Sequence, residues 1–231
     1  MAIDISAFGT PPNWIHSLPA DLSTNLLKRA RLHSYLQNDL IYDLGDAPGG
    51  IYGIVSGVVG IGTDDNESSM IYGHLLGRGA WIGENAVLTG SNRQVAAVVL
   101  SSQADIASVS FPVLNEFAEV EPRLWKALAA LSAQNAQIAI QTARDLMIRD
   151  ADGRCLAVLR RIANSIGANQ SIPISQEELA EMCGVSRGAL SKSLGKLEGR
   201  DLLKRGYRSI ELAAQFSSRS ERLTLADRTA R

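Results

Sequence analysis

The sequence predicts an α+β protein of two domains, because short strand patterns fill its first half and helical patterns dominate its second. The 231 residues are too many for one small module and suit two domains of ~100–150 residues each. Hydrophobic residues make up 45% of the chain and charged residues 20%, which is ordinary globular composition. We therefore expect a β-sandwich or barrel followed by a mainly helical domain.

The strand pattern runs from Leu40 to Phe111, after a short helix expected to begin near Asp21 or Ser23. Its Val-, Ile- and Tyr-rich runs are separated by glycine and by Asp, Asn and Ser turns, which favours a sandwich or barrel. Trp81 is expected in its core. The clearest runs are 51–59, 70–76 and 96–100.

From Glu121 the apolar pattern changes to alternating steps of four and three, which predicts one helix of ~25 residues and roughly 37 Å. This helix either packs on its own domain or forms a two-fold coiled coil, in which the polar Asn135 would fix the register. We expect the homodimer. The predicted dimer seam is Leu124, Leu128, Leu131, Asn135, Ile138 and Thr142.

A capping-box sequence from Ser175 to Glu178 predicts the start of a further helix. Gly184 follows it and can adopt the left-handed conformation that a tight turn needs. Ser186 then caps a second helix. Its predicted buried stripe is Leu190, Leu194 and Leu197.

The opposite face of this second helix carries small and basic residues instead of the usual Glu–Lys pairs. At ~100° per residue, Gly188, Lys192 and Gly195 point away from the stripe, with Arg187 and Ser191 beside them. Small residues let the backbone approach the floor of a DNA groove. Arg187 can bond guanine in bidentate fashion, and Lys192 can reach a base or a phosphate. The pattern therefore predicts a helix-turn-helix that reads double-stranded DNA.

Charge and a basic hairpin support the same expectation. Residues 1–149 carry 9 Lys/Arg and 14 Asp/Glu, whereas residues 150–231 carry 14 and 10. The segment 202–212 is typical of a β-hairpin wing with a basic tip, where Lys204 and Arg205 would face phosphates. The expected DNA-binding residues are Ser186, Arg187, Gly188, Ser191, Lys192, Lys204 and Arg205.

Together, 45–46, 51–59, 75–79, 82–84 and 185–187 make the chain resemble the cyclic-AMP receptor protein/FNR family of transcription regulators. The resemblance spans roughly Leu40 to Leu212 and implies a jelly-roll sensor domain, a long dimer helix and a winged helix-turn-helix. It also implies that Arg187, Gly188 and Lys192 read bases. Members that sense cyclic AMP have Glu at the position of Gly188, so a different half-site is expected.

The resemblance further implies a pocket for a cyclic nucleotide such as cyclic AMP, with Glu84 on the ribose and Arg93 on the phosphate. Two of the three pocket elements differ between this chain and the family members that bind cyclic AMP. Their Ser/Thr-Ala after the arginine is replaced by Gln94-Val95, and the Thr-Ser of their dimer helix is replaced by Ala139-Ile140. No cofactor is implied. The expected effector-binding residues are Gly83, Glu84, Arg93, Gln94 and Thr142.

Two alternatives stay open at this stage. The jelly roll could be a ligand-independent dimerisation scaffold, or the chain could be a cupin-type β-barrel enzyme. The three histidines lack HxH spacing and the two cysteines lack CxxC spacing, so neither a metal site nor catalysis is expected. The histidines are His16, His33 and His74, and the cysteines are Cys155 and Cys183.

The chain has no apolar run long enough for a membrane span and no signal-peptide pattern at 1–10, which favours a cytoplasmic protein. The expected partners are DNA, a second copy of the chain and RNA polymerase. The predicted divisions are 1–120 for the sensor domain, 121–149 for the dimerisation helix, 150–213 for the DNA-binding domain and 214–231 for a flexible tail.

Overall fold

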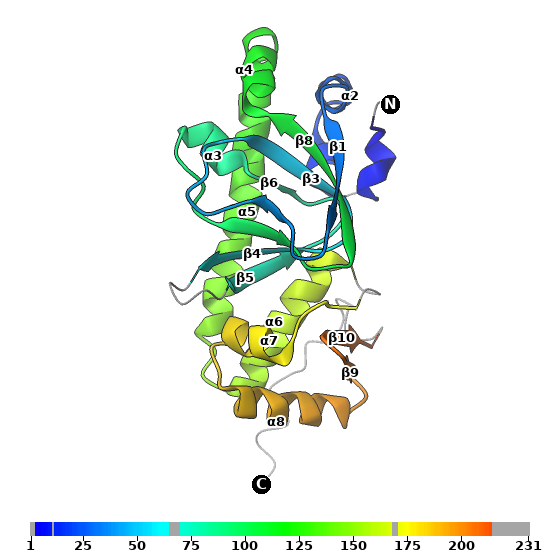
Figure 1. The fold of residues 1–231 in the computed structure, drawn as a ribbon, viewed down its shortest axis with the longest axis vertical. Helices are drawn as coiled ribbons and strands as arrows, with labels where there is room; N and C mark the ends of the chain where they lie inside the picture. Colours follow the sequence, from blue (N-terminus) through cyan, green and yellow to red (C-terminus); the bar gives the residue numbers. More distant parts are fainter. Residues whose placement is uncertain (1–2, 11, 65–69, 168–170, 214–231) are drawn as a thin grey trace.

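The computed structural model describes residues 3–10, 12–64, 70–167 and 171–213, so the predicted tail lies outside the described residues. Two antiparallel four-stranded sheets face each other in a jelly roll (Figure 1), which confirms the expected fold class. The first sheet contains β1 (Arg31–Leu36), β8 (Gln103–Ser110), β3 (Gly50–Ser56) and β6 (Trp81–Ile82), in that order. The second contains β2 (Leu40–Tyr42), β7 (Ala96–Val99), β4 (Val59–Asp64) and β5 (Met70–Leu76).

The predicted run 51–59 is two strands rather than one. Gly57 separates β3 from β4 and adopts a φ of +89°, a conformation that glycine enters without steric cost. A side chain there would also collide with the neighbouring strand, because a Cβ would lie 2.6 Å from the Gln103 carbonyl oxygen. The turn between the sheets therefore depends on this glycine.

Helical segments cover the first sheet at the end of the jelly roll that is distant from the second domain. They are η1 (Ile5–Phe8), α1 (Trp14–Ser17), α2 (Ala20–Leu27), α3 (Glu84–Thr89) and α4 (Phe111–Val120). Trp81 is 1% exposed, as expected of a core residue. Its ring packs against Phe8 and Trp14, with ring centroids 5.0 and 5.3 Å away.

The long helix α5 (Arg123–Leu146) packs along its own domain, which corrects the predicted dimer seam. Leu124, Leu128 and Leu131 are at most 2% exposed and belong to the same hydrophobic cluster as Trp14 and Trp81. The Trp14 Nε1 donates to the Ala127 carbonyl oxygen at 2.8 Å. The remaining seam residues also face the jelly roll: Asn135 donates to the Trp81 carbonyl oxygen at 3.1 Å, and Ile138 and Thr142 line a cavity.

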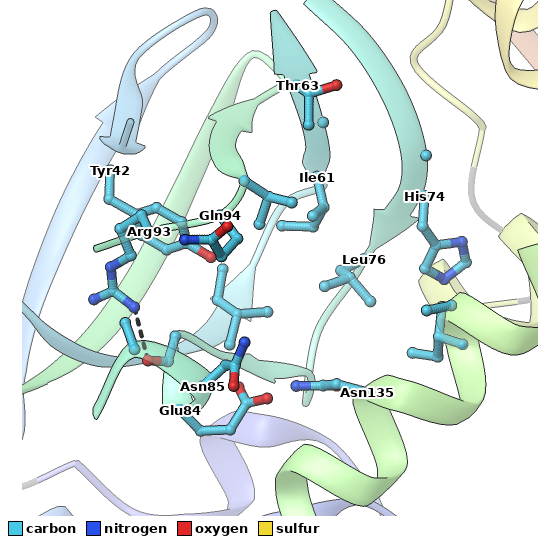
Figure 2. A pocket seen from close by; sticks show the side chains of 18 of the residues that line it. Tyr42, Ile61, Thr63, His74, Leu76, Glu84, Asn85, Arg93, Gln94 and Asn135 are labelled. Atoms are coloured by element: carbon cyan, nitrogen blue, oxygen red, sulfur yellow. Dashed lines mark hydrogen bonds between the residues drawn. The ribbon is translucent and has the colours of Figure 1, made fainter. Parts of the chain in front are cut away.

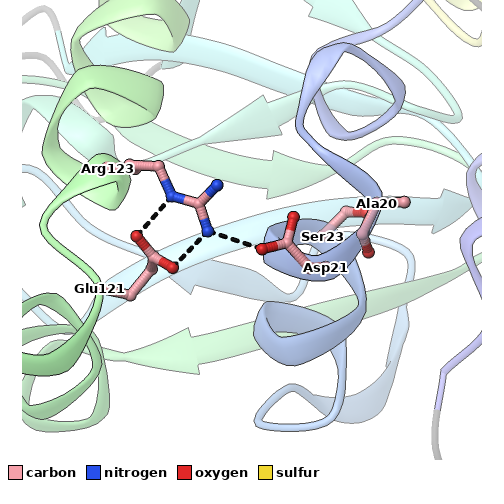
Figure 3. Close-up of polar contacts among 5 residues, drawn as sticks. All are labelled: Ala20, Asp21, Ser23, Glu121 and Arg123. Carbon is pink, nitrogen blue, oxygen red and sulfur yellow. Dashed lines mark hydrogen bonds and ion pairs between the residues drawn. The ribbon is translucent and has the colours of Figure 1, made fainter.

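A polar tie holds the start of α5 against α2 (Figure 3). The Arg123 guanidinium bonds the Glu121 carboxylate beside it and the Asp21 carboxylate of α2, with an Nη2 to Oδ2 distance of 2.6 Å to Asp21. Helix α2 begins at Ala20, one residue before Asp21, whereas Ser23 is buried within the helix. Since Arg123 and Asp21 are about half exposed, this pair orients the two helices more than it stabilises them.

The second domain contains α6 (Ala151–Ile166), α7 (Gln176–Cys183), α8 (Arg187–Glu198) and the hairpin β9 (Leu203–Gly206) and β10 (Ser209–Leu212). The predicted capping box forms, because the Ser175 hydroxyl and the Glu178 side chain each bond the other's backbone N–H. Gly184 ends α7 in the left-handed conformation. The winged helix-turn-helix is therefore confirmed. Of the helices in the described ranges, none is long and apolar enough to cross a membrane.

This second domain docks on strand β5 of the jelly roll (Figure 1). Tyr72 and Leu75 of β5 share one buried cluster with Ile162 and Ile166 of α6 and with α7. At Gly77 the backbone of the jelly roll contacts the backbone of α6, since a Cβ at Gly77 would lie 2.6 Å from the Ile166 Cα. The absence of a side chain at Gly77 therefore sets how closely the two domains approach.

We predict that Gly77→Ala lowers the free energy of unfolding by about 1–3 kcal/mol, because the added methyl overpacks the domain interface. Gly73→Ala is the matched control. A Cβ at Gly73 meets only the Ile61 carbonyl oxygen at 3.8 Å, so this variant should stay close to wild type. Urea unfolding followed by circular dichroism measures both variants, and equal stabilities would contradict the interface described here.

Candidate functional site

A cavity of about 430 Å³ lies between the second sheet, β6, α3 and α5 (Figure 2). The structure brings together all five sequence-predicted effector residues on its wall: Gly83, Glu84, Arg93, Gln94 and Thr142. Their role in binding stays a prediction. The volume lies within the range of ~300–1,000 Å³ that small-molecule pockets span.

Arg93 is held by the protein's own backbone. Its Nη1 donates to the Gly83 carbonyl oxygen at 2.7 Å and its Nη2 to the Gly50 carbonyl oxygen at 2.8 Å (Figure 2 shows the first bond). Its Cζ lies 4.4 Å from the centroid of the Tyr42 ring and 5.5 Å from that of Tyr52, which places the cation over two aromatic faces. Arg93 is only 3% exposed, so its guanidinium stabilises the loop around Gly50 and Gly83.

Glu84 supplies a buried carboxylate at the first turn of α3. It is 5% exposed, and burial raises its pKa although Asn135 hydrogen-bonds the carboxylate and the Arg93 charge favours ionisation. Gly83 precedes it with a φ of +93°, and a Cβ there would lie 2.8 Å from the Arg93 Nη1. Only glycine therefore lets Arg93 and Glu84 occupy this corner together.

His74 lines the opposite part of the cavity and connects it to the second domain. Its Nδ1 lies 2.6 Å from the Nη1 of Arg161 on α6. Arg161 also bonds the Gly73 carbonyl oxygen at 3.1 Å and, through Nε, the Asp145 carboxylate of α5 at 2.7 Å. The cluster therefore joins β5, α5 and α6. Sequence reasoning missed it, because Gly73 and His74 of β5 lie 71 or more residues from Asp145 and Arg161.

Four of the expected DNA-facing residues, Arg187, Gly188, Ser191 and Lys192, belong to α8, which lies at the end of the molecule opposite α4 (Figure 1). The Ser186 hydroxyl caps the helix by accepting from the Ala189 N–H at 3.2 Å. Arg187, Gly188 and Lys192 are exposed and Ser191 is half-buried. A Cβ at Gly188 would meet no atom within 4 Å. The predicted inner stripe of Leu190, Leu194 and Leu197 is buried.

The basic residues of the wing differ in whether they form ion pairs within the protein. Lys204 is exposed and forms no ion pair within the described ranges. By contrast, the Arg205 Nε donates to the Glu198 carboxylate at 2.8 Å, so its guanidinium fastens the wing to α8. Arg208 pairs with Glu178 at 3.0 Å. Tyr207 at the tip between the strands is 94% exposed, and sequence reasoning did not single it out.

Two further groupings in the second domain were not foreseen. Ser193 of α8 is 1% exposed, and its hydroxyl donates to the Asp152 carboxylate at 2.5 Å, which also pairs with Lys196. The free thiols of Cys155 and Cys183, both buried, lie within hydrogen-bonding reach of each other in the domain core. Neither group faces the cavity. No three His, Cys, Asp or Glu side chains of the described residues are arranged to hold a metal ion.

Comparisons with known proteins agree with this architecture. A model of the cyclic nucleotide-binding domain matches residues 32–120, and a model of the Crp-like helix-turn-helix domain matches residues 153–214. The chain is 24% identical over 182 residues to the cAMP-activated global transcriptional regulator CRP of Escherichia coli O157:H7, covering 77% of this chain and 87% of that protein. It is 25% identical over 207 residues to the CRP-like protein Clp of Xanthomonas euvesicatoria, covering 84% and 90%.

Solved structures share the fold. FixK2 from Bradyrhizobium japonicum superposes with a TM-score of 0.68 at 19% identity, covering 80% of this chain and 94% of FixK2. The c-di-GMP responsive global regulator CLP of Xanthomonas campestris gives a TM-score of 0.62 at 21% identity, with the same coverages.

A cyclic nucleotide-binding-type β-domain, a long helix and a helix-turn-helix, in this order, define a class of transcription regulators that couple a sensor domain to DNA. The chain belongs to the Crp/Fnr family of these regulators. Its jelly roll is thereby assigned to the cyclic nucleotide-binding type rather than to the cupin-type enzyme considered from sequence.

We predict that His74 makes the stability of the protein depend on pH. Burial and the Arg161 charge lower its pKa from 6.5 to about 3. The unfolded chain therefore takes up a proton as pH falls below 6.5, whereas the folded chain does so only near 3. The contribution of neutral His74 to the free energy of unfolding is therefore fully present above pH 6.5. Below that pH it declines by up to ~1.4 kcal/mol per pH unit.

Urea unfolding at pH 7.5, 6 and 5 measures this loss. His74→Gln cannot take up the proton, so its stability should fall less steeply with pH than that of wild type. The matched control is His33→Gln, at an exposed position of β1, which should follow the wild-type slope. Parallel pH profiles for all three proteins would contradict the prediction.

Proposed function

We propose that the chain is a cytoplasmic, homodimeric transcription regulator that reads a two-fold symmetric DNA site through α8, with RNA polymerase as the partner through which it acts. The observation that carries the base-reading role is the outer face of α8, where Arg187, Gly188 and Lys192 are exposed and no ion pair within the described ranges engages either basic residue. Half-sites of such a dimer lie ~34 Å apart on the duplex.

We propose 1–120 as the sensor domain, 121–149 as the dimerisation helix and 150–213 as the DNA-binding domain. A cavity of about 430 Å³ with a buried Glu84 and Arg93 on its wall supports a ligand-sensing role over that of a ligand-independent scaffold.

We place the dimer contact on the exposed stripe of α5, which replaces the seam expected from sequence. At ~100° per residue these positions share one side of the helix, roughly 130° around the helix from the face that packs on the jelly roll. Trp125 is 38% exposed and Ile140 is 60% exposed, so the stripe presents two large apolar side chains that a partner could cover. The proposed stripe is Trp125, Ala129, Ala136, Ile140, Ala143 and Met147.

We predict that Arg187→Ala removes sequence selectivity. A bidentate base contact contributes ~1–3 kcal/mol of discrimination, so selection from a random-sequence DNA pool should no longer favour one base at the affected position in each half-site. Lys204→Ala is the comparison variant. It should weaken binding to all sequences similarly and lower the salt slope by about 1. If the Arg187→Ala variant selects the same consensus sequence as wild type, the proposed base-reading role of Arg187 is contradicted.

We predict that Ala136→Glu yields a monomer, because it would place two carboxylates in the proposed stripe contact. Ala130→Glu is the matched control, since Ala130 is also exposed but lies about 120° around the helix. Sedimentation velocity should show a dimer for wild type and Ala130→Glu and a monomer for Ala136→Glu. A dimer that survives Ala136→Glu and dissociates in Ala130→Glu would place the interface on the other side of α5.

A further inference from the structure

The wing of the second domain carries an aromatic side chain at its tip. Tyr207 and Arg208 form the two-residue turn between β9 and β10, and the Gly206–Ser209 pair closes this turn. Tyr207 is 94% exposed, so its ring and its hydroxyl are both accessible from outside. The side chain therefore contributes little to the packing of this chain and is available to a partner.

Two basic side chains of the wing are engaged within the protein. The Arg205 Nε bonds the Glu198 carboxylate of α8 at 2.8 Å, and the Arg205 backbone N–H bonds the same carboxylate at 3.1 Å. Arg208 bonds the Glu178 carboxylate at 3.0 Å. The other oxygen of Glu178 caps α7 by accepting from the Ser175 N–H at 2.7 Å. A carboxylate therefore neutralises each arginine, and the two pairs hold the wing against α7 and α8.

The backbone of the tip is held in an uncommon conformation. Arg208 has a φ of +46°, a left-handed value that few residues other than glycine adopt. The pair with Glu178 restrains the same residue through its side chain. A turn that is ordered in advance loses less conformational entropy on binding than a flexible one. The wing is therefore suited to present Tyr207 to a partner in one orientation.

A cleft of about 210 Å³ places Tyr207 beside the base-reading end of α8. Tyr207 and Arg208 line the cleft from the wing, and Arg187 lines it from the start of α8. Ser175 and Gln176 complete it from the start of α7. Arg187 is the proposed base contact in the major groove, and a sugar-phosphate backbone borders that groove on each side. A duplex that meets Arg187 therefore brings one backbone to the wing side of the cleft.

The tyrosine hydroxyl matches a phosphate in its chemistry. Phosphate oxygens of DNA accept hydrogen bonds, and tyrosine is among the side chains that donate to them at protein–DNA interfaces. Counterions are released when a cationic side chain neutralises a phosphate. A neutral hydroxyl releases none, so this contact should strengthen binding without adding to its salt dependence.

We infer that Tyr207 is a DNA contact of the wing, and that its hydroxyl donates to a backbone phosphate next to the bases that Arg187 reads. The inference rests on the proposed function, because it adds a residue to the proposed DNA interface. Tyr207 takes the place of Arg205, which the sequence assigned to a phosphate and which bonds Glu198 in the structure.

Fluorescence anisotropy of the full-length protein measures this contact on two duplexes, one selected from the random-sequence pool and one of mixed sequence, at about 50 to 200 mM salt. Tyr207→Phe removes only the hydroxyl. It should weaken binding to both duplexes by ~3- to 10-fold, the effect of losing one hydrogen bond. The salt slope and the selected sequence should stay as in wild type. Wild-type affinity in Tyr207→Phe, or a changed selected sequence, would overturn the inference.

Tyr207→Lys tests whether a phosphate lies at the tip. An ammonium beside a phosphate releases about one more counterion, so the salt slope should become steeper by about 0.9 on both duplexes. Val120→Lys is the matched control, because it adds the same charge at a 76% exposed position of α4, at the opposite end of the molecule (Figure 1). This control should keep the wild-type slope. Equal slopes in the two lysine variants would overturn the phosphate contact.

The inference and the proposed function fail separately in these measurements. Wild-type affinity in Tyr207→Phe, together with a clear selected sequence, would overturn the tip contact alone. A wild-type protein that enriches no sequence would overturn the base-reading function, while the mixed-sequence duplex still measures the contact of Tyr207 with a backbone. A wild-type protein that binds neither duplex would overturn both.

Discussion

Packing of one side of α5 against the jelly roll governs the arrangement of the remaining parts. Leu124, Leu128 and Leu131 are buried against the sensor core, and Trp14 donates to the backbone of the same helix. This attachment orients the remaining sides of the helix. Further along the same side, Ile138 and Thr142 line the cavity, and the exposed apolar stripe faces outward. One helix therefore serves as core element, cavity wall and proposed dimer contact.

Strand β5 has a comparable double role. His74 and Leu76 line the cavity, whereas Tyr72 and Leu75 belong to the hydrophobic cluster shared with α6 and α7. A single strand therefore separates the cavity from the DNA-binding domain. The Arg161 side chain contacts that strand at His74 and at the Gly73 carbonyl oxygen. Coupling between the two sites thus needs no long chain of intervening residues.

Local patterns in the sequence predicted much of this molecule. The capping box at Ser175, the turn at Gly184 and the leucine stripe of α8 were all foreseen, because each depends on residues within one or two helical turns. The five expected effector residues also line the cavity, an outcome that came from a family resemblance rather than from periodicity.

The features that sequence reasoning missed depend on contacts between distant segments. A four–three apolar repeat describes equally well a helix seam that meets a second copy and one that meets its own domain, so the α5 seam was assigned to the wrong surface. The repeat in the exposed stripe gives a weaker apolar signal, because half of its residues are alanines. Likewise, neither His74 nor Arg161 carries a local signal, since only the docking of α6 on β5 brings them together.

The contact at Gly77 limits how the two domains can move relative to each other. The end of β5 and α6 contact each other there through backbone atoms. A change of side-chain rotamer therefore cannot widen this contact gradually. Close-packed contacts of this kind separate or stay closed, which favours two discrete arrangements over a continuous range. Glycine at this position therefore favours a regulator whose two domains are either docked or separated, without intermediate positions.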